Sequence, residues 1–186
     1  MISRSLPYCV EIDGKEHAIT NRCDFRMVID VITILNDEEY SMPLRLEMAL
    51  SLFYEEPREI TNGEKALSEM FKIINLGEEP KGKTEKVKPV MDWNHDYNRI
   101  IPPINRVLGY DARDPERFTH WWTLVGAYGE IGGECAFANI VSIRQKKNNN
   151  KKLEKHEEEF YRANRDIINI PRAMTQEERD WLSDDW

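Results

Sequence analysis

Residues 92–144 read DWNHDYNRIIPPINRVLGYDARDPERFTHWWTLVGAYGEIGGECAFANIVSIR and contain three of the five tryptophans of the chain. Apolar side chains recur here every three to four residues, which is the spacing of one face of an α-helix. Two sets occur: Trp93, Tyr97, Ile100, Ile101, Ile104 and Leu108, then Phe118, Trp121, Trp122, Val125 and Tyr128. Aromatic side chains of this size need an apolar environment or a partner. The stretch is therefore expected to be helical and to supply much of the core.

The ends of these helices are marked by residues that start or stop helical backbone. Asp92 is expected to cap the first helix, and Gly109 to end it. The pair Pro102–Pro103 disfavours uninterrupted helix, so we expect two short helical pieces with a bend between them. Asp114, followed by Pro115, has the pattern of an N-cap before a first-turn proline and predicts the start of the second helix.

Toward the N-terminus, Asp13 and Gly14 give the strongest short-range signal for a β-hairpin, with residues 10–12 and 16–19 as its strands. From Asp24 to Asn36 the apolar residues follow one helical face, although their β-branched run leaves a strand as the alternative. We favour the helix at this position.

Two further helices are expected before residue 78. The first begins at Pro43 and ends near Tyr54. The second begins with a capping box formed by Thr61 and Glu64, and Gly77 ends it.

Residues 78–90 lose this periodicity and have the composition of an extended linker, with two prolines and few apolar side chains. We therefore expect a subdomain of hairpin and helices at 1–77, the linker at 78–90, and an aromatic-rich helical domain at 91–186. The predicted fold class is mainly α, a helical protein with a small N-terminal β-hairpin and two helical subdomains.

Beyond the aromatic stretch, weaker signals predict three more helical segments. The face expected to be buried in the first comprises Cys135, Ala138, Val141 and Ser142. The second is strongly charged and carries Leu153, Phe160 and Tyr161. The third is a short terminal helix, in which a capping box of Thr175 and Glu178 precedes Trp181 and Leu182.

Composition and charge limit the classes of function. The chain has 186 residues, 40% of them hydrophobic, which is enough for a packed core. Its net charge of −8 and pI near 5.2 argue against a dedicated nucleic-acid binder. The sequence has no signal-peptide pattern and no apolar run of roughly 20 residues, so no membrane span is expected. Three scattered cysteines without a CxxC pair indicate a reducing cytoplasm.

Residue types that bind metals or catalyse reactions are present, but their spacing is unfavourable. The four histidines form no HxxxH or HExxH pair; they are His17, His95, His120 and His156. Beside Trp121, His120 is expected to pack or hydrogen-bond in the core, with catalysis as the lesser alternative. No metal site, cofactor or enzymatic activity is expected.

Two further clusters have structural explanations that we favour over chemical ones. Four carboxylates could share acid/base work, yet Asp92 and Asp114 are better explained as helix caps; the other two are Asp96 and Asp111. Four glycines lack the order of a phosphate-binding loop and are expected to allow a turn between helices; they are Gly126, Gly129, Gly132 and Gly133.

One basic patch follows the aromatic stretch and comprises Arg144, Lys146, Lys147, Lys151, Lys152 and Lys155. A solvated helix end is the favoured interpretation. Contact with phosphates or with an acidic part of a protein partner is the alternative.

Several of these segments resemble the bacteriophage Gp15 family of tailed phages and prophages of Gram-positive bacteria. The resemblance is carried by Asp92-Trp93, by INRVLGYDARDPERFTHWWTLVGAY at 104–128, by the Gly-Glu-Cys that follows, and by IVSIR at 140–144. It extends to IDGK at 12–15, DFR at 24–26 and EEFYR at 158–162. The sequence departs from the family pattern at Gly132-Gly133 and at Asn148–Asn150, where we expect differences in loop length.

The resemblance implies a tail assembly chaperone, because members are similar to products encoded just upstream of the tape-measure gene. Such a protein would bind the tape-measure protein in the cytoplasm of the bacterial host cell and keep it soluble until tail-tube protein polymerises around it. This role is compatible with a second tail chaperone and with homo-oligomerisation. No nucleic-acid or membrane partner is expected. The alternative is a structural tail component retained in the virion.

Large aromatic side chains are the candidates for binding such a partner, because a few buried aromatics carry most of the energy of an interface. They are Trp93, Tyr97, Trp121, Trp122, Tyr128, Trp181 and Trp186. The helical stripes to which the first five belong are also explained by core packing. For Trp181 and Trp186 two readings stay open: docking of the terminal segment onto its own domain, or an aromatic hook for a partner.

Overall fold

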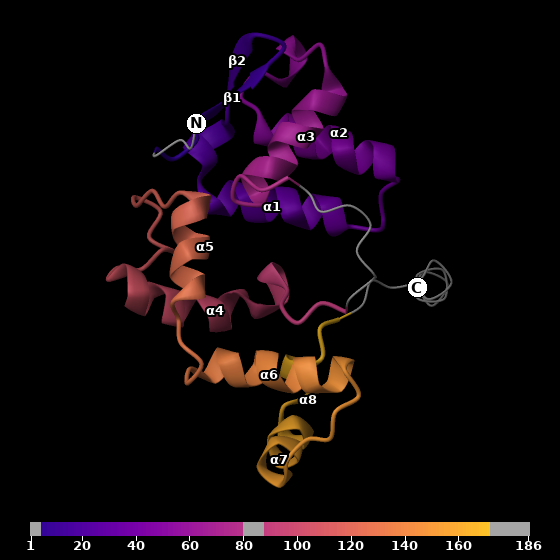
Figure 1. Ribbon diagram of the computed structural model, residues 1–186, viewed down its shortest axis with the longest axis vertical. Helices are drawn as coiled ribbons and strands as arrows, with labels where there is room; N and C mark the ends of the chain where they lie inside the picture. The colour runs from indigo at the N-terminus through magenta and orange to yellow at the C-terminus, as the bar shows by residue number, and fades with distance from the viewer. Residues whose placement is uncertain (1–4, 80–87, 172–186) are drawn as a thin grey trace, which may run out of the picture.

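Residues 5–79 and 88–171 are described by the computed structural model, and in this part of the chain eight α-helices accompany one two-stranded hairpin (Figure 1). The N-terminal elements are β1 (Cys9–Ile12), β2 (Lys15–Ala18), α1 (Phe25–Asn36), α2 (Met42–Phe53) and α3 (Gly63–Ile74). The later elements are α4 (Trp93–Leu108), α5 (Trp121–Gly129), α6 (Ala136–Asn148), α7 (Lys155–Ala163) and α8 (Arg165–Ile168). The predicted mainly α fold with an N-terminal hairpin is confirmed.

The hairpin forms where its turn residues predict it. Strands β1 and β2 pair antiparallel, with Ile12 opposite Lys15. Asp13 and Gly14 both have positive φ, 52° and 82°, as a two-residue hairpin turn requires. Val10 and Ile12 are buried, so one face of the ribbon packs on the core.

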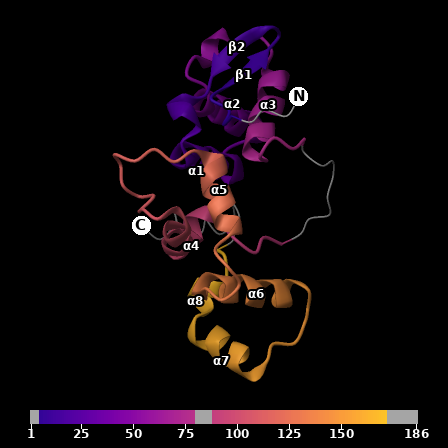
Figure 2. The ribbon, with the colours of Figure 1, turned by 60° about the vertical axis from the view of Figure 1, so that its left-hand side comes forward.

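The segment after the hairpin is helical, and the alternative of a strand at residues 24–36 is excluded. Asp24 caps α1 by accepting a hydrogen bond from the backbone N–H of Arg26 at 3.0 Å. In both ribbon views α1 lies between the hairpin with α2 and α3 on one side and α4 with α5 on the other (Figure 1, Figure 2). Burial on two sides explains why β-branched residues tolerate a helix here, because packing outweighs their modest propensity.

Helix α3 begins one residue later than its sequence signal suggested. The side chain of Asn62, not of Thr61, accepts the capping hydrogen bond, from the backbone N–H of Lys65 at 3.1 Å. The predicted capping box of Thr61 and Glu64 is therefore wrong. The helix ends at Ile74 with Asn75 as its C-cap, slightly before the predicted Gly77. Gly77, with φ of 86°, closes the turn that follows by donating its backbone N–H to the carbonyl of Lys72 at 2.7 Å.

Helix α4 runs without interruption from Trp93 to Leu108 although Pro102 and Pro103 lie inside it. The predicted division into two pieces is wrong. A proline removes the hydrogen bond to the carbonyl four residues earlier. Because Pro102 and Asn98 are both exposed, water can bind the carbonyl of Asn98. The opposite face is held by three fully buried residues, Ile100, Ile101 and Ile104.

The ends of α4 are as predicted, whereas the start of α5 is not. Asp92 accepts a hydrogen bond from the backbone N–H of His95 at 2.7 Å, and Gly109 has φ of 76°. Asp114 instead organises a turn in the loop of residues 110–119, where its carboxylate accepts from the backbone N–H of Glu116. The N-cap of α5 is His120.

Helix α6 buries a different face from the predicted one. Its buried residues are Phe137, Ile140, Ile143 and Arg144, whereas Ala138, Val141 and Ser142 are partly exposed. The larger apolar side chains and a paired arginine decide the orientation. Cys135 lies outside the helix and caps it, with its Sγ accepting from the backbone N–H of Ala138 at 3.4 Å.

The buried side chains of the described residues form one core that includes residues from both sides of the predicted linker. Residues 80–87 of that linker lie outside the described residues. The division into two subdomains therefore stays a prediction. The terminal helix with Thr175, Glu178, Trp181 and Leu182 also lies outside the described residues. None of the helices in residues 5–79 and 88–171 has the length and apolar composition needed to cross a bilayer.

Candidate partner-binding surface

The five described aromatic residues of the predicted binding set pack against the core. Trp121 is 3% exposed, and the others are partly buried: Trp93, Tyr97, Trp122 and Tyr128. The Trp93 ring lies edge-on to the rings of Trp121 and Tyr128, with centroids 5.3 and 6.1 Å away. Burial raises the pKa of the Tyr97 and Tyr128 hydroxyls.

Two tryptophans of α5 also donate hydrogen bonds to the C-terminal end of α3. The indole N–H of Trp121 donates to the carbonyl of Ile74 at 2.9 Å, and that of Trp122 to the carbonyl of Ile73 at 2.8 Å. The last carbonyls of a helix lack partners within it, so these bonds join the C-terminal end of α3 to α5. The rings therefore have structural partners, and their part in binding another protein stays a prediction. Trp181 and Trp186 lie outside the described residues.

Other large apolar side chains are exposed within the described residues. They are Tyr8, Tyr40, Met42, Leu44, Leu76, Val107, Phe118 and Phe160. Only Phe118 belongs to the aromatic stripes found in the sequence. Periodicity identifies which residues share a helix face, but it does not say which face the fold leaves uncovered.

His120 is the buried centre of a cluster of rings at the start of α5. Its Nδ1 accepts a hydrogen bond from the backbone N–H of Trp122, and its Nε2 donates to the carbonyl of Pro7, both at 3.0 Å. The rings of Tyr8, Phe118 and Trp122 stand edge-on around the imidazole. The predicted packing and hydrogen-bonding role is confirmed. Burial lowers the pKa of His120, so the neutral form is favoured.

A left-handed turn places Arg22 above this cluster. Asn21, Arg22 and Cys23 have φ of 49°, 55° and 63°, a conformation that is costly for residues with a side chain. The Arg22 guanidinium carbon lies 4.6 Å from the centre of the Tyr8 ring and 5.4 Å from that of Phe118. Both aromatic rings are exposed, and cations bind such ring faces favourably.

Arg22 and Phe118 line a groove of about 670 Å³ between the start of α1 and the loop of residues 110–119. Arg26 joins the two sides of the groove, because its guanidinium pairs with Asp24 and donates to the carbonyls of Asp114 and Arg117. Hydrogen bonds from Arg26 and from the backbone outweigh burial and lower the pKa of Asp24. Sequence reasoning missed this groove because its two main walls, residues 21–30 and 115–118, are far apart in the chain.

A second polar cluster is buried deeper and joins α4 to α6. The Arg144 guanidinium forms a bidentate ion pair with the Asp96 carboxylate, at 2.6 and 2.9 Å. Arg144 is 4% exposed and Asp96 is fully buried. The assignment of Arg144 to a solvated basic patch is therefore wrong. Two features of the sequence could have indicated this burial: Arg144 lies among the apolar residues of α6, and Asp96 lies among those of α4.

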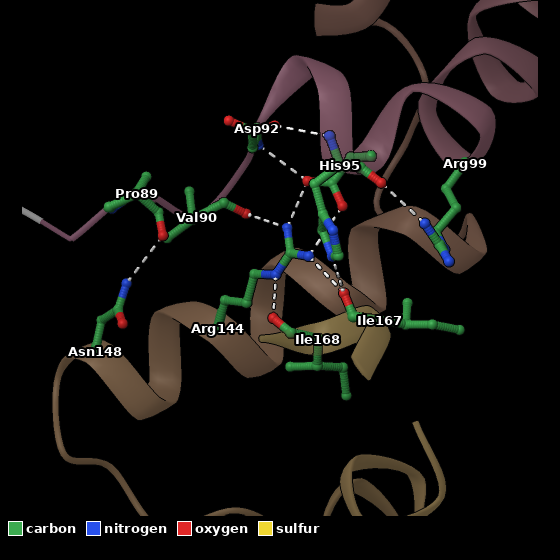
Figure 3. Close-up of polar contacts among 10 residues, drawn as sticks. Pro89, Val90, Asp92, His95, Arg99, Arg144, Asn148, Ile167 and Ile168 are labelled. Atoms are coloured by element: carbon green, nitrogen blue, oxygen red, sulfur yellow. Dashed lines mark hydrogen bonds and ion pairs between the residues drawn. The ribbon is translucent and has the colours of Figure 1, made fainter. Parts of the chain in front are cut away.

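The remaining donors of Arg144 hold two separate chain segments (Figure 3). They donate to the carbonyl of Val90, before α4, and to those of Ile167 and Ile168 in α8. The ring of His95 makes a further hydrogen bond to the Ile167 carbonyl at 2.9 Å. All five guanidinium N–H groups are thus used, so this cluster is a structural clamp without a free donor for a ligand.

The rest of the predicted basic patch is partly engaged. Lys146 pairs with Glu157 at 2.6 Å, and Lys147 lies over the ring of Tyr161. Lys151, Lys152 and Lys155 are exposed. In the described part of the chain, no three His, Cys, Asp or Glu side chains gather closely enough to hold a metal ion.

Comparison with known proteins identifies one relationship. A family model described as Bacteriophage Gp15 protein matches residues 2–170 of the chain. No curated protein and no solved structure matches it.

Proposed function

The chain belongs to the bacteriophage Gp15 family, and we propose that it is a tail assembly chaperone that binds the tape-measure protein in the host cytoplasm. The observation that carries this proposal is the family match together with three exposed apolar side chains, Met42 and Leu44 of α2 and Phe118 of the loop before α5. Large contiguous apolar patches on a protein surface mark sites of protein interaction.

The physical mechanism follows from surface composition. Apolar side chains of the chaperone cover apolar surface of the long tape-measure chain, and thereby remove it from water. The net charge of −8 keeps the complex in solution. Release occurs when tail-tube subunits compete for the same surface. A second chaperone and several copies of this chain are compatible with coating a long client.

Co-expression with the tape-measure protein tests the proposal. We expect the soluble fraction of the tape-measure protein to rise, and a complex to be recovered by affinity purification and sized by light scattering. The matched control is the same expression level of an unrelated acidic helical protein. The proposal fails if the tape-measure protein is no more soluble with this chain than with the control and no complex is recovered.

Mass spectrometry of purified virions addresses the alternative role. A chaperone is released before the particle is complete, so its peptides should be absent. Stoichiometric recovery from virions would instead assign the chain to the tail structure.

A further inference from the structure

Helix α2 is unusually apolar for a helix at the surface. Of its residues only Ala49 and Phe53 are buried, whereas Met42 is 55% and Leu44 41% exposed. Met48 is partly exposed. Methionine is a flexible, polarisable side chain that adapts to varied apolar partners. The exposed part of α2 therefore has the composition of a binding surface.

One flank of α2 leads directly into the groove beside Arg22. Leu44, Met48 and Leu52 are spaced four residues apart and so share one flank of the helix. Leu52 lines the groove together with Met27 of α1 and Phe118. The flank and the groove thus form one track, which we call the α2 track and define by Leu44, Met48, Leu52, Phe118 and Arg22.

Arg22 is the arginine of the groove that lacks a carboxylate partner among the described residues. Arg26 pairs with Asp24, and Arg117 lies 3.7 Å from the carboxylate of Asp114. Arg22 instead has its faces against Tyr8 and Phe118, which leaves its N–H edge for another molecule. A guanidinium held in this way loses little freedom when it binds a carboxylate by two parallel hydrogen bonds.

We propose that the α2 track binds an amphipathic helix of the client protein, with an acidic residue of that helix paired to Arg22. Apolar residues at intervals of four would lie along Leu44, Met48 and Leu52. The proposal rests on the chaperone function and names the surface that performs it. Asp30 and Glu116 also line the groove without an ion-pair partner among the described residues, so a basic residue of the client fits beside the acidic one.

Three substitutions test the track by co-expression of the full chain with the full-length tape-measure protein. Arg22→Glu reverses the charge, and Arg22→Asn removes it while a residue that tolerates left-handed backbone stays in place. Leu44→Glu places a charge on the apolar flank. Each should reduce the tape-measure protein recovered per chaperone by roughly tenfold or more, as loss of a central interface residue does.

Matched controls make the corresponding charge reversal and the corresponding apolar-to-glutamate change outside the track. Arg58→Glu and Val107→Glu alter exposed residues of the 3-10 turn Pro57–Glu59 and of α4, and recovery should stay at the level of the unmodified chain. Circular dichroism establishes that every variant is folded. Recovery with the unmodified chain should also fall as salt is raised, and this dependence should be weaker for Arg22→Asn.

The outcomes separate the two proposals. If the unmodified chain recovers no tape-measure protein, the chaperone function itself fails. If it does recover the client and the three track variants recover as much as the controls, the function stands and the α2 track is wrong. A change of oligomeric state in the track variants, with recovery unchanged, would also overturn the inference and assign the surface to self-association.

Discussion

Arg144 and Asp96 form a buried ion pair, in which each charge alone would destabilise the fold and the two together stabilise it. Moving either charge out of water costs several kcal/mol, and the cost is offset only when every hydrogen-bonding atom is satisfied. Arg144 meets this condition because its five N–H groups reach Asp96 and three backbone carbonyls. The pair therefore holds α4, α6 and α8 in one arrangement.

Removal of one partner should be strongly destabilising. For Arg144→Met we expect the free energy of unfolding, measured in urea, to fall by about 3–5 kcal/mol, because the Asp96 carboxylate stays buried without its counter-ion. The control is Glu158→Gln, which breaks the exposed ion pair with Arg162 and should cost much less. Equal effects of the two substitutions would contradict a clamp role.

His120 makes stability depend on pH. Burial lowers the pKa of its imidazole below the ordinary value of 6.5. As pH falls below 6.5, the unfolded chain takes up a proton that the folded chain does not bind, so the free energy of unfolding should decrease. We expect this decrease between about pH 7 and pH 5 to be steeper than in His120→Asn, which keeps a capping acceptor.

The deciding quantity is the difference in the slope of stability against pH between the unmodified chain and His120→Asn over this range. If His120→Asn shows the same slope as the unmodified chain, another group is responsible.

At the scale of elements, the start of α3 shows how two neighbouring residues compete to cap one helix. Thr61 and Asn62 are adjacent residues that can both cap a helix, and the structure uses Asn62. Asn62 also donates to the carboxylate of Asp13 in the hairpin turn at 3.0 Å. A contact across 49 residues therefore favours the second candidate.

Substitution of the two candidates separates them. Asn62→Ala should lower the free energy of unfolding by about 0.5–2 kcal/mol, the usual effect of losing an N-cap. Thr61→Ala should have little effect, because Thr61 is exposed and precedes the cap. Thermal unfolding followed by circular dichroism measures both, and a larger loss for Thr61→Ala would restore the capping box.

In the whole molecule, the core crosses the predicted boundary near residues 78–90. The indoles of α5 bind the end of α3, and α1 contacts both α4 and α5. By contrast, α6, α7 and α8 form a layer at one end of the molecule (Figure 1, Figure 2). The buried ion pair between Arg144 of α6 and Asp96 of α4 connects this layer to α4.

Unfolding experiments distinguish these arrangements. We expect near-ultraviolet signals, which report tryptophan packing, and far-ultraviolet signals, which report helix, to show one coincident transition. Two separated transitions would support two independent subdomains. In Arg144→Met, amide exchange should accelerate in α6 and α8 and stay slow in α1 and α3, which would identify the end layer as the part that the clamp secures.

Much of the local structure could be predicted, because hairpin turns and helix caps depend on residues a few positions apart. Asp13-Gly14, Asp92 and Gly109 each act within one turn of backbone and were assigned correctly. The break predicted at Pro102 is absent, because packing of the isoleucines beside it maintains a helix that local geometry disfavours. The burial of Arg144 could not be predicted from its neighbours in the sequence, because its carboxylate partner is 48 residues away.

The amino-acid sequence by itself determined that the chain is helical, acidic, and rich in aromatic side chains that require burial, since these properties follow from short-range periodicity and composition. Tertiary structure alone decided which apolar faces stay uncovered and which charges are buried. Leu44 reaches the surface because α2 buries Ala49 and Phe53 on its other face, whereas Arg22 and Phe118 are exposed in a turn and a loop. Exposure depends on what lies opposite a side chain in space, and neighbours in the sequence do not specify that.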